Sequence, residues 1–376
     1  MRSVLSHCKG ERSYMEMRFK SEKMHLSDSL EEINRELYLR GMTDGLPVIP
    51  PTEECVEAIL RGTALEPDCE IAVLPPAWVP ATVEGIAINA VMAGCLPEHL
   101  PVLITAVQAM ANPEFSLLGT LATTGGMAVS IMLNGPIRHE IELNCSNNLF
   151  GPGRQANAVI GRALRLIQIN IAGAIPGITD KSCHGWPGKY TLCWGENEEA
   201  SPWVPFHVEA GFERNESIVT VFAAGCLNRV GAGWTTTGRG ALQSLAYGMR
   251  PVNAMLLGLG NGAKCFLVLG PETAHQIARD GISKADVREY LFLHARCQFE
   301  DNYHPDSGEK LSLEDMRKSS TNLWPDGTVS IADKPDDIIV VVAGGPGRQS
   351  VFFPPDARSR PVTLRIDPAL KRSRRS

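Results

Sequence analysis

The sequence predicts an α/β fold of two similar lobes that follow a helical N-terminal segment. Three observations indicate this class. Ala-rich helices begin near residue 80 and alternate with apolar strands. The order of strand, Gly-Pro turn and helix then occurs twice along the chain. Finally, 376 residues, of which 44% are hydrophobic and 21% charged, suit a globular protein with room for two lobes.

Residues 1–40 are expected to hold an N-terminal extension and the first helix. In SDSLEEINRELYLRG, Ser27 or Ser29 can cap that helix, and acidic residues fill its first turn. Residues 41–79 are expected to form a rigid loop, PVIPP, and a second helix that Thr52 caps.

The two lobes are placed at residues 80–180 and 217–350. In the first, Ala-rich helices precede the strand MAVSIMLNGP and the amphipathic helix RQANAVIGRALRLIQIN. In the second, TTTGRGALQSLAYGM, AKCFLVLGPETAHQIARDG and SKADVREYLFLHARC follow the same order, and DIIVVVAGGPGR is matched to QINIAGAIPGIT. We infer that a pseudo-two-fold relates the lobes, with chance similarity of α/β units as the alternative.

Three segments lie outside this repeat. Residues 181–216 form a polar inter-lobe loop rich in candidate site residues. Residues 298–335 are a polar insertion in the second lobe, expected to be a surface excursion or lid. Residues 351–376 are a C-terminal segment with a basic tail, expected to be a solvated end.

The composition excludes several classes of protein. A net charge of -6 gives no general attraction to nucleic acid. No stretch approaches the roughly 18 apolar residues of a membrane helix, and the N-terminus lacks a signal-peptide core. The ten cysteines contain no CxxC pair, so most are expected to be free and buried in a cytoplasmic protein.

The stretch NGPIRHEIELNCSNNLFGPGRQANAVIGRALRLI predicts a binding site for a small anion. Gly151 and Gly153 let main-chain amides approach a ligand, and Arg154 begins a helix whose N-terminus favours negative charge. Arg162 and Arg165 share a helix face and can clamp a carboxylate. The alternative is a Gly-Pro turn that caps a helix with solvated arginines. Further substrate-binding candidates in this stretch are Asn134, Arg138 and Asn157.

Other glycine-rich turns add candidates for substrate binding. LATTGG and WTTTGRG place Thr124 and Thr236 beside glycines, one in each lobe, where hydroxyls and amides can hold a carboxylate. AGGPGR places Gly344 and Gly345 after an apolar strand, where ligands bind in open α/β sheets. The alternatives are a helix cap and an ordinary turn.

The stretch DKSCHGWPGKYTLCWGENEEASPW supplies the catalytic candidates. Lys189 or Tyr190, together with Glu196, is predicted to form an acid/base pair, since chemistry near neutral pH needs one group tuned as base and another as acid. The alternative is a polar linker over packed aromatic residues.

A thiol or metal site is also considered in this stretch. Cys183 and His184 invite a nucleophile interpretation, but adjacent residues in an extended segment point to opposite sides. A metal bound by Cys183, His184 and His207 is a weaker alternative, because their spacing is unspecific.

Five phrases carry a resemblance over roughly residues 40–350: TDGLPVIPPTEECVEAIL, INAVMAGCLPEHLPVL, NGPIR, FGPGRQANAVIGRALRLI and PGKYTLCWGENEEASPW. The chain resembles an uncharacterised bacterial family, the large domain fused to or encoded beside a small module with a UGSC or CGSC motif, where U is selenocysteine. The resemblance implies thiol-linked redox chemistry on a small metabolite. This chain lacks that motif, and AGCL at Cys226 is no substitute, so a thiol or selenol redox protein would be its partner.

Together these observations predict a cytoplasmic enzyme that acts on a small organic acid in an inter-lobe cleft. The resemblance favours an oxidoreductase, whereas the residue types favour a lyase or hydratase with acid–base catalysis beside a carboxylate. A non-catalytic substrate-binding subunit and a metal-dependent hydrolase remain open. The sequence has no nucleotide or flavin motif, and the cofactor is left open.

Overall fold

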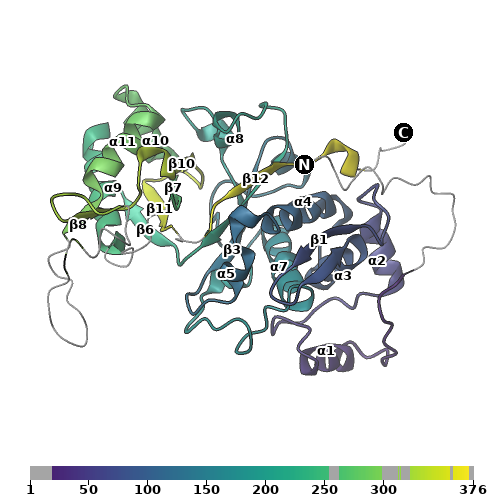
Figure 1. Cartoon of the computed structure of the whole chain (residues 1–376). Coiled ribbons are helices and arrows are strands. Elements are labelled where there is room, and N and C mark those ends of the chain that lie inside the picture. Colours follow the sequence, from purple (N-terminus) through teal and green to yellow (C-terminus); the bar gives the residue numbers. More distant parts are fainter. Residues whose placement is uncertain are drawn as a thin grey trace.

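The computed structural model describes residues 19–253, 262–298, 312, 314, 322–355 and 359–371. Within these ranges the chain is a mixed α/β protein with eleven α-helices, two four-stranded sheets and two two-stranded sheets (Figure 1). None of the helices in this part of the chain is long and apolar enough to cross a membrane. Most of the predicted insertion, much of the N-terminal extension and the end of the basic tail lie outside the described residues.

The first sheet has the strand order β12-β5-β3-β4. Its central strand β3 (Ala128–Asn134) pairs parallel with β4 (Cys193–Gly195) and antiparallel with β5 (Ile218–Ala224). β12 (Val362–Arg365) pairs antiparallel with β5 at the edge. β5, which the sequence analysis placed in the second lobe, therefore belongs to the first sheet, and the C-terminal segment completes that sheet.

The second sheet has the strand order β10-β7-β11-β6. Here β7 (Cys265–Leu269) pairs parallel with β10 (Ile338–Val342) and antiparallel with β11 (Gln349–Phe353). β6 (Asn228–Gly231) pairs antiparallel with β11 at the edge. Both sheets thus have the same succession of strand pairings: parallel, antiparallel, antiparallel.

One equivalence drawn from the sequence is wrong. DIIVVVAGGPGR contains the strand β10, whereas QINIAGAIPGIT contains the end of a helix and the loop after it. The strand that holds the position of β10 in the first sheet is β4. β4 has only three residues and lies between two polar loops, so its hydrophobic pattern is too short to identify it as a strand from the sequence.

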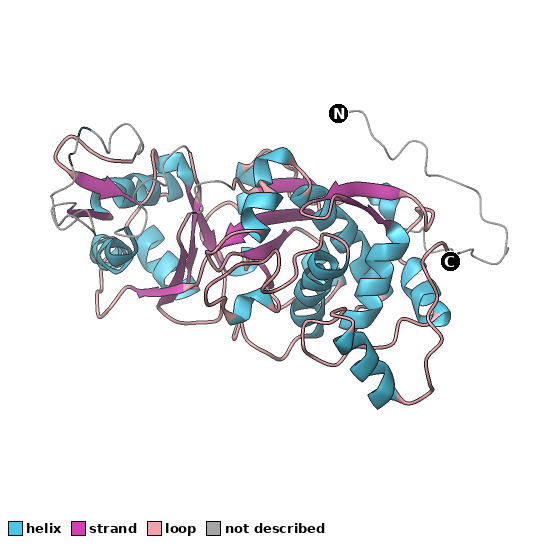
Figure 2. Cartoon of the chain, turned by 60° about the horizontal axis from the view of Figure 1, so that its bottom comes forward, coloured by secondary structure: helices cyan, strands magenta, loops and turns pink. Residues whose placement is uncertain are grey.

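Helices cover the outer face of each sheet and lie at opposite ends of the molecule (Figures 1 and 2). α4 (Leu100–Met110) contacts β5 and β12 of the first sheet, and α7 (Gln155–Asn170) contacts β3 and β4, whereas α3 (Val83–Ala93) packs on α7 and α4. α9 (Gly238–Asn253) contacts β6 and α11 (Lys284–His294) contacts β10 of the second sheet, whereas α10 (Pro271–Arg279) packs on α9. The remaining elements are α1 (Leu30–Leu39), α2 (Glu53–Leu60), α5 (Leu117–Leu121), α6 (Ile137–Glu140), α8 (Phe206–Glu209), β1 (Glu70–Leu74), β2 (Val79–Thr82), β8 (Arg296–Gln298) and β9 (Thr328–Ser330).

The inner faces of the two sheets pack against each other through an aromatic core. Trp194, Phe222, Phe266 and Phe353 come from four different strands and are buried there. The rings of Phe222 and Phe266 stack with their centroids 3.9 Å apart. The layers are therefore helix, sheet, sheet and helix. Side chains fill the space between the sheets, so the predicted inter-lobe cleft is not found along these strands.

The predicted helix starts near the N-terminus are confirmed. The side chain of Ser29 accepts a hydrogen bond from the main-chain N–H of Glu32 at the start of α1. The side chain of Thr52 accepts one from Cys55 at the start of α2. Both interactions satisfy main-chain donors that a helix leaves free at its first turn.

Candidate functional site

A pocket of about 570 Å³ lies beside α7. Its walls are formed by residues 43–45, by Arg165 and Ile169 of α7, and by the segment 176–190, which we call the pocket loop. All of its lining residues fall between positions 43 and 190. The pocket is therefore built by the entry segment, the first lobe and the polar segment after it, rather than by a cleft between two lobes.

Four side chains form a hydrogen-bonded cluster in the pocket wall. The Nζ atom of Lys189 lies 2.6 Å from Oδ2 of Asp180 and 2.7 Å from Oγ of Ser182. The Ser182 hydroxyl is also 2.7 Å from Oδ1 of Asp180. Arg165 donates to Oδ2 of Asp180 at 3.1 Å from the buried side of the cluster. Asp180 thus receives two cations, and Ser182 lies beside the lysine.

Local interactions determine the path of the pocket loop. The main-chain N–H of Cys183 donates to the carbonyl of Thr124, and the Ser182 hydroxyl lies 3.1 Å from the carbonyl of Gly125. Gly185 adopts a φ of +63°, and a Cβ atom there would lie 3.7 Å from Cδ of Lys189. A glycine adopts this backbone readily, whereas most residues do not. The turn brings Lys189 back towards Ser182.

The pKa values of the cluster separate its two main ionisable groups. Burial lowers the pKa of Lys189 below its usual value, while Asp180 opposes this shift and the charge of Arg165 adds to it. Burial alone would raise the pKa of Asp180, but hydrogen bonds from Lys189 and Ser182 outweigh burial and lower it. Asp180 therefore favours its ionised form, whereas the neutral form of Lys189 is favoured more than in water.

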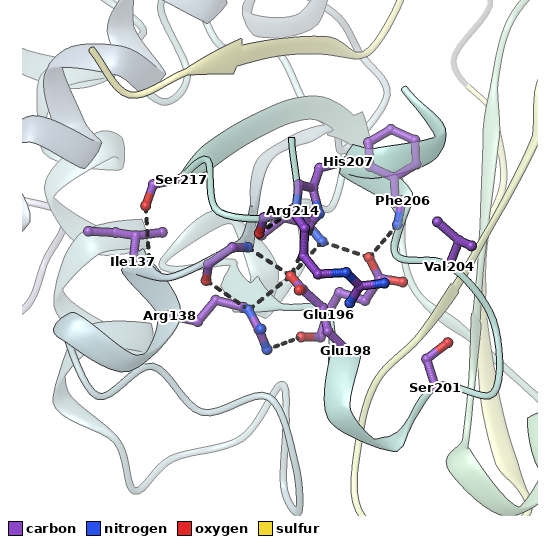
Figure 3. A network of polar contacts seen from close by, with 12 residues as sticks. Ile137, Arg138, Glu196, Glu198, Ser201, Val204, Phe206, His207, Arg214 and Ser217 are labelled. Carbon is purple, nitrogen blue, oxygen red and sulfur yellow. Dashed lines mark hydrogen bonds and ion pairs between the residues drawn. The ribbon is translucent and has the colours of Figure 1, made fainter. Parts of the chain in front are cut away.

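Glu196 lies in a separate polar network that follows β4 (Figure 3). It is fully buried, and its Oε2 atom accepts hydrogen bonds from Asn134 at 2.6 Å and from the main-chain N–H of Phe206 at 2.8 Å. Burial raises the pKa of Glu196 to about 7. Among the described residues, Oε1 of Glu196, Oδ1 of Asn134 and Nδ1 of His207 are buried without a hydrogen-bond partner.

Arg138 belongs to this second network. It is 3% exposed and donates to the carbonyl of Glu196 at 2.8 Å and to both carboxylate oxygens of Glu199, at 3.0 and 2.9 Å. A smaller pocket of about 300 Å³ lies beside it. The guanidinium is already occupied by protein acceptors, which favours a structural role for it.

The three predicted catalytic residues are therefore divided between two places. Lys189 and Tyr190 line the 570 Å³ pocket, and Tyr190 is 49% exposed at its surface. Glu196 does not line that pocket. β4 separates the two positions, because Lys189 precedes the strand and Glu196 follows it.

The residues predicted to bind a small anion before α7 differ in their surroundings. Arg154 is exposed and its side chain makes no capping hydrogen bond at the start of α7. Gly151 packs on Asn148, whereas Gly153 has a φ of +132° and open space around it. Gly151, Gly153 and Arg154 do not line the 570 Å³ pocket. The amide of Asn157 binds the main chain of Asn144 and of Cys193, so it joins the loop to β4.

The two arginines of α7 take different roles. Arg162 donates to both carboxylate oxygens of Asp44, at 2.8 and 3.0 Å, and to the carbonyl of Pro47 at 2.7 Å. It holds the segment that forms one wall of the pocket and is not free to clamp a ligand. Arg165 lines the pocket itself.

The remaining predicted binding residues do not line the pocket. Thr124 is exposed and contacts the pocket loop through its carbonyl. Thr236 is exposed, and its carbonyl accepts from Arg279 at 2.7 Å. Gly344 donates to the carbonyl of Cys145 at 2.9 Å, and Gly345 packs on Asn147. These two glycines therefore join the end of β10 to the loop before α7.

The structure does not bring the proposed metal ligands together. Within the described part of the chain, no three His, Cys, Asp or Glu side chains are placed to hold a metal ion. Cys183 and His184 are exposed on the pocket loop, whereas His207 is buried near Glu198. Cys183 and Cys226 are exposed free thiols, and Cys69 is disulfide-bonded.

Sequence analysis missed Ser182 and Asp180 as site residues. A signal for them exists, since positions i and i+2 of an extended segment point to the same side. Asp180 and Ser182 therefore had the spacing to lie on one wall, whereas the contact with Lys189 depends on the turn at Gly185.

A scan against protein-family models and a search of the curated proteins found no match for this chain.

Proposed function

We propose that the chain is an enzyme whose active site is the 570 Å³ pocket and whose substrate is a small molecule with a carboxylate. The observation that carries this proposal is the contact of Lys189 with Ser182 and Asp180 in the pocket wall. A cavity of this size suits a small ligand. A lysine whose pKa is lowered in such a cavity is suited to proton transfer.

The charges around the pocket favour an anionic ligand. Three basic side chains and two acidic ones lie in the pocket wall or directly behind it, which leaves one net positive charge while Lys189 is protonated. These are Arg162, Arg165, Lys189, Asp44 and Asp180. A molecule with a single carboxylate balances that charge.

Each residue of the cluster has a distinct role in this proposal. Lys189 transfers the proton. Asp180 stays ionised and orients the lysine through their 2.6 Å contact. Arg165, which is buried, holds Asp180 in place at 3.1 Å. The cluster thus combines a proton-transfer group with a fixed support, as acid–base catalysis requires.

The pseudo-two-fold between the lobes also remains our inference. The identical succession of strand pairings in the two sheets supports it. So does the Gly-Pro turn and helix after both β3 and β7. The outermost strand is supplied by β6 in one sheet and by β12 in the other, so the relation is not a simple tandem duplication.

A thermal-shift screen tests the proposed function. Wild type, Lys189→Met and Lys181→Met are each heated with small carboxylic acids and with the matching neutral amides. Lys181 is exposed and donates to the carbonyl of Gly177, so its substitution is a matched control. A ligand at a hundredfold excess over Kd adds about 2.7 kcal/mol of stability.

We expect one or more carboxylates, but not their amides, to stabilise wild type and Lys181→Met. The same acids should have little effect on Lys189→Met. A wild-type protein that no carboxylate stabilises would contradict the proposal.

A further inference from the structure

We propose that Ser182 is a nucleophile that forms a covalent acyl intermediate. The substrate is then an ester, thioester or amide of a small acid that keeps one free carboxylate. This inference rests on the proposed function of the 570 Å³ pocket and specifies its reaction.

The position of Ser182 carries the inference. Its side chain lines the pocket, and its Oγ atom lies 2.7 Å from Nζ of Lys189. A serine hydroxyl is a weak nucleophile until a neighbouring base takes its proton. Here the base is held by a third group, Asp180, at 2.6 Å. Nucleophile, base and orienting group are thus all within hydrogen-bond reach, as covalent catalysis requires.

The surrounding loop fixes Ser182 in place before any ligand binds. The carbonyl of Gly125 lies 3.1 Å from its hydroxyl, and the next residue, Cys183, is tied to the carbonyl of Thr124 at 3.0 Å. A reacting group held in position loses little entropy on the way to the transition state.

Other potential nucleophiles on the pocket loop lack this support. The thiol of Cys183 is exposed, and the described contacts connect only its main-chain N–H to the rest of the site. Tyr190 lines the pocket and is 49% exposed, but the described hydrogen bonds do not include one from its hydroxyl to Lys189. Ser182 is the hydroxyl that Lys189 contacts.

The reaction needs only water as a second reactant. Neutral Lys189 accepts the Ser182 proton while Oγ bonds to the acyl carbon. The bond between the acyl carbon and the leaving group then breaks. Lys189 passes its proton to the leaving group, which departs as an alcohol, thiol or amine. Water then adds to the acyl carbon and gives a proton to Lys189, the Oγ–carbon bond breaks, and Ser182 regains its proton. The products are the free acid and the leaving group, with no change of oxidation state.

Covalent labelling of the full chain tests this step. The protein is incubated with a fluorophosphonate and, separately, with the p-nitrophenyl monoester of a small dicarboxylic acid, and peptide mass spectrometry locates the adduct. We expect the adduct on Ser182 and its complete loss in Ser182→Ala.

Three further variants separate the base from the fold and from thiol labelling. Lys189→Arg keeps the positive charge beside Asp180 but cannot be deprotonated, so labelling should slow by about a hundredfold or more while the protein stays folded. Cys183→Ala and Lys181→Met should label as wild type does.

Absence of an adduct on Ser182 with both reagents would overturn the inference, as would undiminished labelling of Lys189→Arg. If Ser182 forms no adduct but carboxylates still stabilise the wild-type protein, the proposed function of the pocket stands without the acyl intermediate. If wild type shows neither the adduct nor the stabilisation, both proposals are contradicted.

Discussion

The Nζ atom of Lys189 lies 2.7 Å from the Oγ atom of Ser182, and both residues lie on one loop between α7 and β4. The turn at Gly185 returns the chain so that the two side chains meet. Asp180, on the same loop, contacts both of them. The catalytic proposal thus depends on one loop and on the α7 residue Arg165 that supports it.

Replacing Asp180 with Asn should lower stability and change its dependence on pH. The folded pKa of Asp180 lies below its usual value of 3.8, so its ionised form stabilises the fold above about that pH, and this contribution is lost as the pH falls through the folded pKa. We expect Asp180→Asn to lower the free energy of unfolding near neutral pH by about 1–3 kcal/mol. Below about pH 4 its difference from wild type should shrink.

Urea denaturation across this pH range measures the effect. Asp28→Asn is the control, because Asp28 is exposed beside the first helix. A constant difference between Asp180→Asn and wild type at every pH would argue against an ionised, hydrogen-bonded Asp180.

Glu196 should produce the opposite dependence on pH. Its folded pKa of about 7 lies above its usual value of 4.5, so its contribution to stability is fully present below about pH 4.5 and is lost as the pH rises through about 7. Glu196→Gln stays neutral and should be about 1–3 kcal/mol more stable than wild type near pH 8, with little difference near pH 4.5.

Guanidinium denaturation at both pH values tests this prediction. Glu199→Gln is the control, because hydrogen bonding to Arg138 lowers the pKa of Glu199 to about 2, away from the range of interest. Parallel stability profiles for wild type and Glu196→Gln would mean that Glu196 does not titrate there.

The aromatic core between the sheets should be essential for stability. Phe222→Ala removes a buried ring that stacks on Phe266 and contacts the ring of Phe353, so we expect a loss of about 3–5 kcal/mol in urea denaturation. Tyr38→Ala is the control, since Tyr38 is 62% exposed and its loss should change stability little. A small effect of Phe222→Ala would indicate an open cleft instead of a packed core.

How much of this structure the sequence predicts depends on the range of each interaction. The sequence narrows the first cap to Ser27 or Ser29 and identifies Thr52 as the second, because a cap needs only residues a few positions away. β12 pairs with β5 across more than a hundred residues, and no local pattern indicates that contact. The aromatic core is likewise assembled from four strands that are distant in sequence.

The same reasoning applies to the candidate site. Lys189 and Tyr190 lie on the pocket loop, and Glu196 was paired with them because chemistry near neutral pH needs both an acid and a base. A short strand, β4, carries Glu196 away from the pocket. Arg162 was assigned to the ligand because nothing nearby in sequence reveals Asp44, more than a hundred residues earlier.

Arg162 provides a test of the wall that faces the pocket loop. Arg162→Ala leaves Asp44 unpaired at the pocket and removes its net positive charge, so a carboxylate ligand should bind about tenfold more weakly, or about 1.4 kcal/mol. Isothermal titration with the carboxylate from the screen measures this. The double variant Arg162→Ala/Asp44→Asn restores the balance of charge, and its affinity should recover in part. If the affinity does not recover, the weaker binding comes from a changed shape of the pocket wall and not from its charge.

Whether Lys189 exchanges a proton inside the pocket can be measured by NMR titration of lysine side chains labelled at Cε, with Lys189→Met used to assign the resonance. We expect a midpoint for Lys189 below the usual 10.5, which rises when a carboxylate binds. A midpoint at or above 10.5 would contradict this expectation, because Lys189 would then be a permanent structural cation and Ser182 would lack a base.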